Sequence, residues 1–92
     1  MLHLIAYDIS CGRRLRRVAR ICEDYGLRVE KSVFECFLSQ ETFCELWEKL
    51  SKIIDEEDGD RIVAYPIALN EQKNIKVLGR CTAGSHQDIY IF

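Results

Sequence analysis

Residues 4–38 read LIAYDISCGRRLRRVARICEDYGLRVEKSVFECFL, and their pattern decides the fold. The apolar run that ends at Ile9 has the length of a buried strand. Apolar residues then recur at helical spacing over residues 15–25, and Gly26 follows as a C-terminal cap. The chain from residue 27 onward is rich in β-forming residues separated by polar ones, which is typical of strands. This stretch therefore predicts a strand, a helix and further strand in that order.

The ends of the predicted helix and strands in residues 4–38 are marked less clearly by the pattern than their order is. Ser10 and Gly12 supply a break in the pattern and a candidate N-cap for the helix. Residues 27–39 are too many for one ordinary strand, so we expect more than one, with a reversal or a bulge at Glu35 or Cys36.

The second half of the chain repeats the alternation of helix and strand. Ser39 and Thr42 form a candidate cap, and the apolar residues that follow predict a second helix over 39–57. Residues 61–69 are typical of another buried strand, in which Pro66 indicates an edge position or a bend. Two further short strands are expected at 75–79 and 88–92.

This order of elements matches a split β-α-β unit. We predict the α+β class and a ferredoxin-like βαββαβ fold, in which two helices cover one face of an antiparallel sheet. A chain of 92 residues has room for one such domain, over residues 1–92. The extra C-terminal strands have no place in so small a sheet, and an unpaired edge invites another chain. We therefore expect a homodimer that exchanges a strand.

The composition is that of a folding, globular chain, with 48% hydrophobic residues and a single proline. No apolar run reaches membrane length and no segment looks like a secretory leader, so we expect a cytoplasmic protein without membrane contact. The cysteines are odd in number and lack C-x-x-C pairing, which predicts reduced and mostly buried thiols. They are Cys11, Cys22, Cys36, Cys44 and Cys81.

The net charge of −2 conceals an uneven distribution. No acidic residue interrupts residues 10–21, which contain Arg13, Arg14, Arg16, Arg17 and Arg20. Residues 55–60, DEEDGD, concentrate negative charge elsewhere, so we expect a bipolar molecule. On the predicted helix, Arg14 falls on a flank and the other four arginines lie opposite the apolar side. This ridge is either a solvated outer face or a phosphate-binding surface, and the lack of acidic i,i+4 partners leaves the two interpretations evenly balanced.

Asp8 comes at the end of the first predicted strand, where side chains reach the rim of a sheet. Taken alone, this residue is more simply a turn or cap acid near the positive end of a helix. One carboxylate is too little for Mg²⁺, which binds one or two from protein and completes its octahedron with water. A twofold axis near the strand end would add a second Asp8, and a divalent cation would relieve the repulsion between the two carboxylates.

The other polar candidates carry weaker signals. His3 and His86 lack a suitably spaced partner acid, so we expect surface positions or local hydrogen bonds and no catalytic role. Four residues are candidate backbone or base contacts for nucleic acid, although a phenylalanine is more often core: Tyr7, Arg28, Ser32 and Phe34. The sequence contains no G-x-S-x-G, phosphate loop or H-E-x-x-H motif.

The segments AYDISCGRRLRRVARICEDYG and RVEKSVFE resemble the CRISPR-associated Cas2 family, the small dimeric component of the spacer-acquisition module. The resemblance extends over essentially the whole chain. Its specific part comprises Tyr7, Asp8, Arg17, Tyr25, Gly26 and residues 28–35. Glu30 departs from the family pattern, because it stands where the family frequently has glutamine and adds a negative charge beside Arg28 and Lys31.

The resemblance implies a ferredoxin-like homodimer whose late strand crosses to the partner, with Asp8 of each subunit binding Mg²⁺ or another divalent cation such as Mn²⁺. It also implies metal-dependent endonuclease activity on single-stranded RNA or double-stranded DNA. A second implied role is a bridge between two dimers of the integrase partner, Cas1, during insertion of new spacers. Asp8 carries over as the catalytic metal ligand, with supporting roles for Tyr7, Arg17, Arg28, Ser32 and Phe34.

The leading hypothesis is thus a CRISPR adaptation protein that holds duplex DNA along paired arginine ridges, while Asp8 adds metal-dependent hydrolysis. The expected nucleic-acid-binding residues are Arg13, Arg14, Arg16, Arg17, Arg20 and Arg28. Two alternatives stay open. One is a non-catalytic nucleic-acid-binding scaffold, which requires only the arginines, and the other is a toxin-like ribonuclease on the same fold.

Overall fold

A computed structural model describes residues 1–79 of the chain. Its strands are β1 (Leu2–Asp8), β2 (Leu27–Glu30), β3 (Val33–Phe37) and β4 (Arg61–Ile67). Its α-helices are α1 (Gly12–Tyr25) and α2 (Gln40–Ser51), and its 3₁₀ helices are η1 (Glu56–Asp58) and η2 (Leu69–Asn74).

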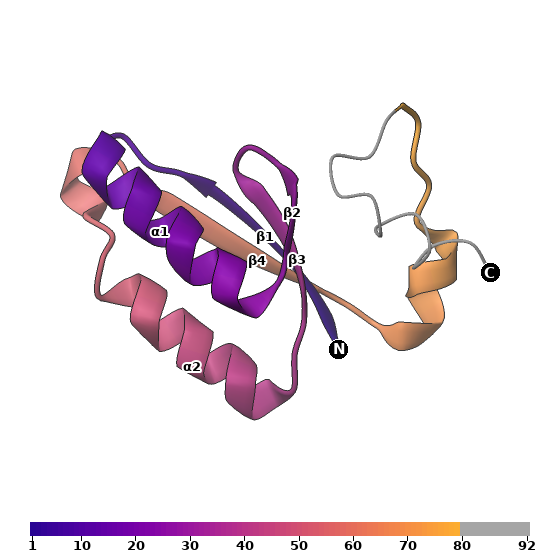
Figure 1. The fold of residues 1–92 in the computed structure, drawn as a ribbon. Helices are drawn as coiled ribbons and strands as arrows, with labels where there is room; N and C mark the ends of the chain where they lie inside the picture. The colour runs from indigo at the N-terminus through magenta and orange to yellow at the C-terminus, as the bar shows by residue number, and fades with distance from the viewer. Residues whose placement is uncertain (80–92) are drawn as a thin grey trace.

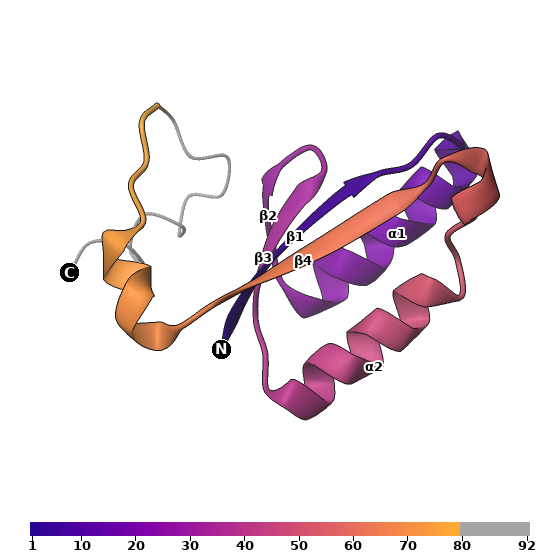
Figure 2. The same ribbon diagram turned by 180° about the vertical axis from the view of Figure 1, so that it is seen from behind.

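The four strands form one sheet in the order β2-β3-β1-β4, and each neighbouring pair is antiparallel. Both α-helices cover the same face of this sheet (Figure 1), and the view from behind shows the strands in front of them (Figure 2). The predicted α+β, ferredoxin-like arrangement is therefore confirmed. Pro66 lies in β4, an edge strand of this sheet, where its missing N–H is tolerated.

The core lies between the sheet and the helices, because alternate strand residues point to opposite faces. Ile5 and Phe34 are fully buried and pack against Val18 and Cys22 of α1 and Leu46 of α2. Burial of one such large side chain stabilises the fold by about 1.5–3 kcal/mol. The residues of opposite parity form the open face, which we define by Leu4, Ala6 and Asp8 of β1, Val33, Glu35 and Phe37 of β3, and Arg61, Val63 and Tyr65 of β4.

The reversal between β2 and β3 lies at Lys31 and Ser32. The prediction of a reversal or bulge at Glu35 or Cys36 is wrong, because both residues lie within β3. Phe34 and Cys36 both point into the core, which requires an uninterrupted strand there. An irregularity in the pairing does occur, but between Arg28 and Glu30.

The helix ends also differ from the prediction. Ser39 caps α2 as expected, since its Oγ accepts a hydrogen bond from the Thr42 backbone N–H at 3.2 Å. The helix stops at Ser51, six residues before the predicted end at 57, and Asp55 then caps η1. Helix α1 begins without a side-chain cap, because Cys11 holds the N-cap position and Ser10 bonds elsewhere.

Gly26 follows α1 with an extended backbone, so its role differs from that of a left-handed cap. A Cβ at this position would lie 2.5 Å from Cys36 Sγ and would collide with the carbonyl oxygen of Glu35. The glycine is needed because the end of α1 passes directly against β3.

Two short strands are predicted after β4, at 75–79 and 88–92. Residues 75–79 form no strand, and the chain before them turns as η2. The predicted strand at 88–92 lies outside the described residues, as do His86 and Cys81.

His3 is buried, so of its two predicted settings, a surface position or local hydrogen bonds, the surface position is wrong. Its ring stacks on Phe43 of α2 with centroids 4.1 Å apart. The cysteines at 11, 22, 36 and 44 are unbridged, but only Cys22 and Cys36 among these are buried. Burial raises the pKa of the Cys22 thiol to about 12 and that of Cys36 to about 11, so both stay protonated and unreactive.

Candidate functional site

Four arginines of α1 line one groove on the helix side of the molecule. Arg13, Arg16, Arg17 and Arg20 are all exposed, and with Ile21 and Ile53 they surround a space of about 430 Å³. We call this surface the arginine groove. It arises because Val18, Ala19 and Cys22 are buried, which turns the remaining side of α1 outward.

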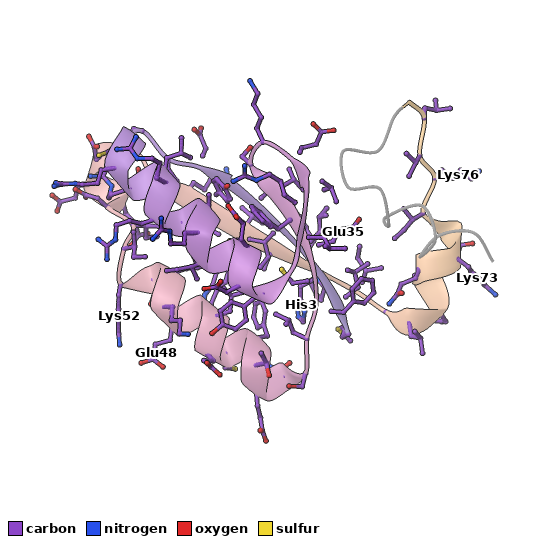
Figure 3. The ribbon with its side chains drawn as sticks, viewed as in Figure 1. His3, Glu35, Glu48, Lys52, Lys73 and Lys76 are labelled. Atoms are coloured by element: carbon purple, nitrogen blue, oxygen red, sulfur yellow. The ribbon has the colours of Figure 1, made fainter. Side chains whose placement is uncertain are left out.

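The arginine groove carries uncompensated positive charge. Among residues 1–79, no carboxylate forms an ion pair with any of its four arginines. Helix α2 behaves differently, because Lys52 pairs with Glu48 at 3.4 Å and Lys49 pairs with Glu45 at 3.5 Å. Both Glu48 and Lys52 project from α2 into solvent (Figure 3). The contrast favours a phosphate-binding surface on α1 over an ordinary solvated face.

Arg14 is held by acidic side chains. Its Nε donates to Asp60 Oδ2 at 2.7 Å and its terminal nitrogen pairs with Asp58 at 2.5 Å. The Asp60 carboxylate, whose side chain is inaccessible to solvent, also accepts from the backbone N–H groups of Ser10 at 3.1 Å and Asp55 at 2.9 Å. Arg14, Ser10, Asp58 and Asp60 form what we call the Asp60 cluster.

The Asp60 cluster bears on two predictions. Arg14 is engaged by Asp58 and Asp60 within the fold, which disfavours its predicted contact with nucleic acid. The hydrogen bond from Arg14 holds the pKa of the Asp60 carboxyl well below its usual value, which keeps the pair ionised. The acidic segment 55–60 lies against the start of α1, so the expected separation of charge into two poles is wrong.

The supporting residues around β2 and β3 pack against one another. Phe34 is fully buried and Tyr7 is 6% exposed, so a direct contact of either ring with a base is disfavoured, and their supporting roles stay predictions. Burial raises the pKa of Tyr7, whose hydroxyl donates to the Lys31 carbonyl at 3.3 Å. The Tyr7 backbone N–H donates to the Ser32 carbonyl at 3.0 Å, which fixes the turn.

Arg28 lies beside this cluster with its guanidinium 5.2 Å from the centre of the Phe34 ring and 3.5 Å from Glu23. Its side chain is 44% exposed. It therefore keeps an open side, and its contact with nucleic acid, like that of Ser32, stays a prediction.

Asp8 is exposed at the end of β1 on the open face. In the β1–β4 pair it stands directly opposite Arg61. Both residues line a shallow hollow of about 280 Å³, together with Tyr7 and with Ala6, Val63 and Tyr65 of the open face. Arg61 was not identified as a site residue from the sequence, because only the register of β1 against β4 places it opposite Asp8. The sequence does show that Arg61 opens the predicted strand 61–69 and faces the same side as Val63.

The family model described as CRISPR associated protein Cas2 matches residues 1–75, which run from β1 through η2. The chain belongs to the Cas2 family. Within the described part of this Cas2-family chain, no helix is long and apolar enough to cross a membrane.

Curated Cas2 proteins match along almost their full length. The chain is 39% identical over 92 residues to the CRISPR-associated endoribonuclease Cas2 1 of Chloroflexus aurantiacus, covering 99% of each protein. It is 35% identical over 97 residues to the CRISPR-associated endonuclease Cas2 of Halalkalibacterium halodurans, covering 100% of each.

Solved structures show the same Cas2 fold. The crystal structure of Streptococcus pyogenes Cas2 at pH 6.5 superimposes with a TM-score of 0.75 at 39% identity, covering 86% of this chain and 100% of that one. A hypothetical protein from Thermus thermophilus superimposes with a TM-score of 0.77 at 31% identity, covering 89% and 94% of the two chains.

One Cas2-family chain offers a single carboxylate for a metal at the end of β1. Among residues 1–79, no three acidic, histidine or cysteine side chains gather closely enough to hold an ion. Mg²⁺ accepts as few as one or two protein carboxylates, so Asp8 fits a metal site when a second copy supplies its own Asp8.

Proposed function

We propose that this Cas2-family protein is a homodimer that binds nucleic acid along two arginine grooves and bridges Cas1 integrase dimers in CRISPR adaptation. The observation that carries this proposal is the set of four arginines without carboxylate partners among residues 1–79, on one surface of α1. A guanidinium binds phosphate through two parallel hydrogen bonds, so adjacent arginines suit the repeated phosphates of a nucleic-acid strand. The net charge of −2 does not oppose this binding, because a phosphate at the groove is attracted mainly by the local cluster of arginines.

The homodimer rests on the apolar character of the open face. Phe37 is 45% exposed and Tyr65 is 51% exposed there, with Leu4, Ala6 and Val63 between them. An exposed apolar patch on a sheet face is a common site of association with another protein surface. A second copy on this face would place two Asp8 residues near each other.

The same protein is proposed to act as a metal-dependent endonuclease. The Asp8 carboxylates of the two copies would hold Mg²⁺ or Mn²⁺, and the bound ion would lower the pKa of a water that attacks a phosphodiester. Several relatives carry the names endoribonuclease or endonuclease, which supports RNA or DNA as the substrate. In this scheme Asp8 positions the ion, and nearby guanidinium groups offset the charge of the phosphate.

Asp8→Asn separates the two roles. We expect this variant to lose Mn²⁺-dependent cleavage of single-stranded RNA and duplex DNA, because the amide supplies no charge for the ion. Its duplex binding should match the wild type, since the arginine groove lies on the other side of the sheet. Equal cleavage by the wild type and the variant would refute the nuclease role of Asp8.

The adaptation role is tested by copurification with Cas1 and by spacer acquisition in cells. Wild-type acquisition by Asp8→Asn together with loss of acquisition by Arg16→Glu/Arg17→Glu is the result expected of a bridge. Unchanged acquisition by the arginine variant would contradict the bridging proposal.

A further inference from the structure

Arg61 shares the end of the open face with Asp8. The two residues are register partners across the antiparallel β1–β4 pair, so their side chains lie on the same face of neighbouring strands. They also line the same hollow of about 280 Å³. A guanidinium and a carboxylate thus border one solvent-open space at the point where β1 ends and β4 begins.

Arg61 takes part in no ion pair within the described part of the fold. It is exposed, and even its register partner Asp8 is not paired with it. Arg14 and Arg28 differ, because Asp60 and Glu23 respectively hold their guanidinium groups. Within one copy the charge of Arg61 is therefore uncompensated, and in the proposed dimer it would border the space where the two Asp8 residues meet.

We propose that Arg61 binds the phosphate of a nucleic-acid strand at the Asp8 site. This inference rests on the proposed hydrolysis at Asp8 and adds to it the residue that positions the substrate. A phosphodiester approaching Asp8 alone meets a like charge, whereas a guanidinium on the adjacent strand attracts it and can hold two of its oxygens. Arg61 acts only as a fixed cation and neither gives nor takes a proton.

The proposed contact is separate from the arginine groove. Helix α1 covers one face of the sheet, and Asp8 and Arg61 belong to the opposite face (Figures 1 and 2). Loss of Arg61 should therefore add to the loss of groove arginines, as expected for changes at independent sites.

The test compares Arg61→Gln, Arg61→Lys and a control, Lys73→Gln, with the wild type. Lys73 is an exposed cation on η2, which lies at the other end of the molecule from η1 (Figures 1 and 3). Binding of a short, labelled single-stranded RNA is measured without metal at several salt concentrations, in both the wild-type and the Arg16→Glu/Arg17→Glu background. Melting temperatures confirm that each variant is folded.

Arg61→Gln should weaken RNA binding about tenfold, the effect of removing one charged hydrogen-bonding partner. It should also reduce the slope of log affinity against log salt by about 0.7, the value for one phosphate of a single strand that is no longer neutralised, in both backgrounds. Arg61→Lys should recover the salt slope, because the charge remains. Wild-type affinity and slope for Arg61→Gln, or an equal change for Lys73→Gln, would overturn the proposal.

Two further measurements separate this inference from the nuclease proposal. Mn²⁺ binding followed by electron paramagnetic resonance should persist in Arg61→Gln and disappear in Asp8→Asn, and the KM for cleavage should rise in Arg61→Gln. If the wild type shows no metal-dependent cleavage, the nuclease proposal fails, yet the metal-free salt slope still decides whether Arg61 binds phosphate. If Asp8→Asn abolishes cleavage while Arg61→Gln keeps the wild-type RNA affinity and KM, only the Arg61 inference fails.

Discussion

At the scale of single residues, the environment of each arginine decides its role. Arg14 and Arg16 are two positions apart on α1, yet one is tied to buried Asp60 and the other borders the arginine groove. A guanidinium that is paired with a carboxylate in the fold is less able to bind phosphate. The pairing of Arg14 with Asp60 therefore leaves Arg14 outside the arginine groove.

The low pKa of Asp60 makes the stability of the protein pH-dependent. The folded-state pKa lies below the ordinary value of 3.8, so the Asp60 cluster stabilises the fold above about pH 4. This contribution is lost as the pH falls toward the folded-state pKa. Thermal melts between pH 7 and pH 2.5 should show a steeper acid loss for the wild type than for Asp60→Asn, which is already less stable at neutral pH. Parallel pH profiles for the two proteins would contradict this role.

At the scale of elements, α1 and α2 share a core but differ in surface chemistry. Helix α2 has an N-cap at Ser39 and two i,i+4 ion pairs, and these features stabilise a helix locally. Helix α1 has neither a side-chain cap nor an acidic residue in its first turn. Its stability therefore depends on packing and on the Asp60 cluster, while its exposed charges are left for a ligand.

Replacing the cap of α2 should have a measurable cost. Ser39→Ala removes the acceptor for the Thr42 N–H and should lower the free energy of unfolding by about 1 kcal/mol. Ser51→Ala, at the opposite end of the helix, removes only an exposed hydrogen bond from the Ser51 hydroxyl to the Glu48 carbonyl and should cost much less. Urea denaturation followed by circular dichroism measures both, and equal effects would argue against the cap.

Charge reversal on α1 should change how duplex binding responds to salt. Arg16→Glu/Arg17→Glu should reduce the slope of log affinity against log salt by about 0.9 for each phosphate that is no longer neutralised. Arg14→Gln is the internal comparison, because Arg14 is already paired with Asp58 and Asp60. Titrations by fluorescence anisotropy should therefore show a wild-type slope for Arg14→Gln, and a reduction in slope equal to that of the groove variant would refute the distinction.

At the scale of the whole molecule, the sheet has two unequal faces. One face is covered by both helices, and the other presents apolar residues together with Asp8 and Arg61. A four-stranded sheet whose second face leaves Phe37 and Tyr65 exposed is suited to association with a second copy.

A charge on the open face should disrupt the proposed dimer. Tyr65→Lys places a cation among Leu4, Ala6 and Val63 and should convert the dimer to a monomer at micromolar concentration. Leu15→Lys, an equally polar change on the helix side, should leave the dimer intact. Sedimentation velocity distinguishes the two species, and a Tyr65→Lys dimer of wild-type affinity would rule out this face as the interface.

The sequence predicted the parts of the fold that depend on local pattern. The apolar run of β1, the amphipathic spacing of α1 and the cap at Ser39 identify their elements without knowledge of tertiary contacts. The shared surface of Arg13, Arg16, Arg17 and Arg20 follows from the same periodicity.

Features that depend on distant residues could not be predicted in this way. Arg14 binds Asp60 across 46 positions, and Asp8 stands opposite Arg61 only through the β1–β4 register. The reversal at residues 31–32 was misplaced because no glycine or asparagine marks it, and the burial of Phe34 and Cys36 sets the strand length instead. Helical spacing continued past Ser51 for a similar reason, since Ile53 is buried after the helix has ended.

The central position of β1 has a consequence for synthesis on the ribosome. The first strand lies between β3 and β4, and Leu2 pairs with Ile67. One edge of β1 must therefore stay unpaired in the nascent chain until residues 61–67 have emerged. Native pairing over such a sequence separation is slow to form, so the growing chain is most exposed to misassociation just before β4 arrives.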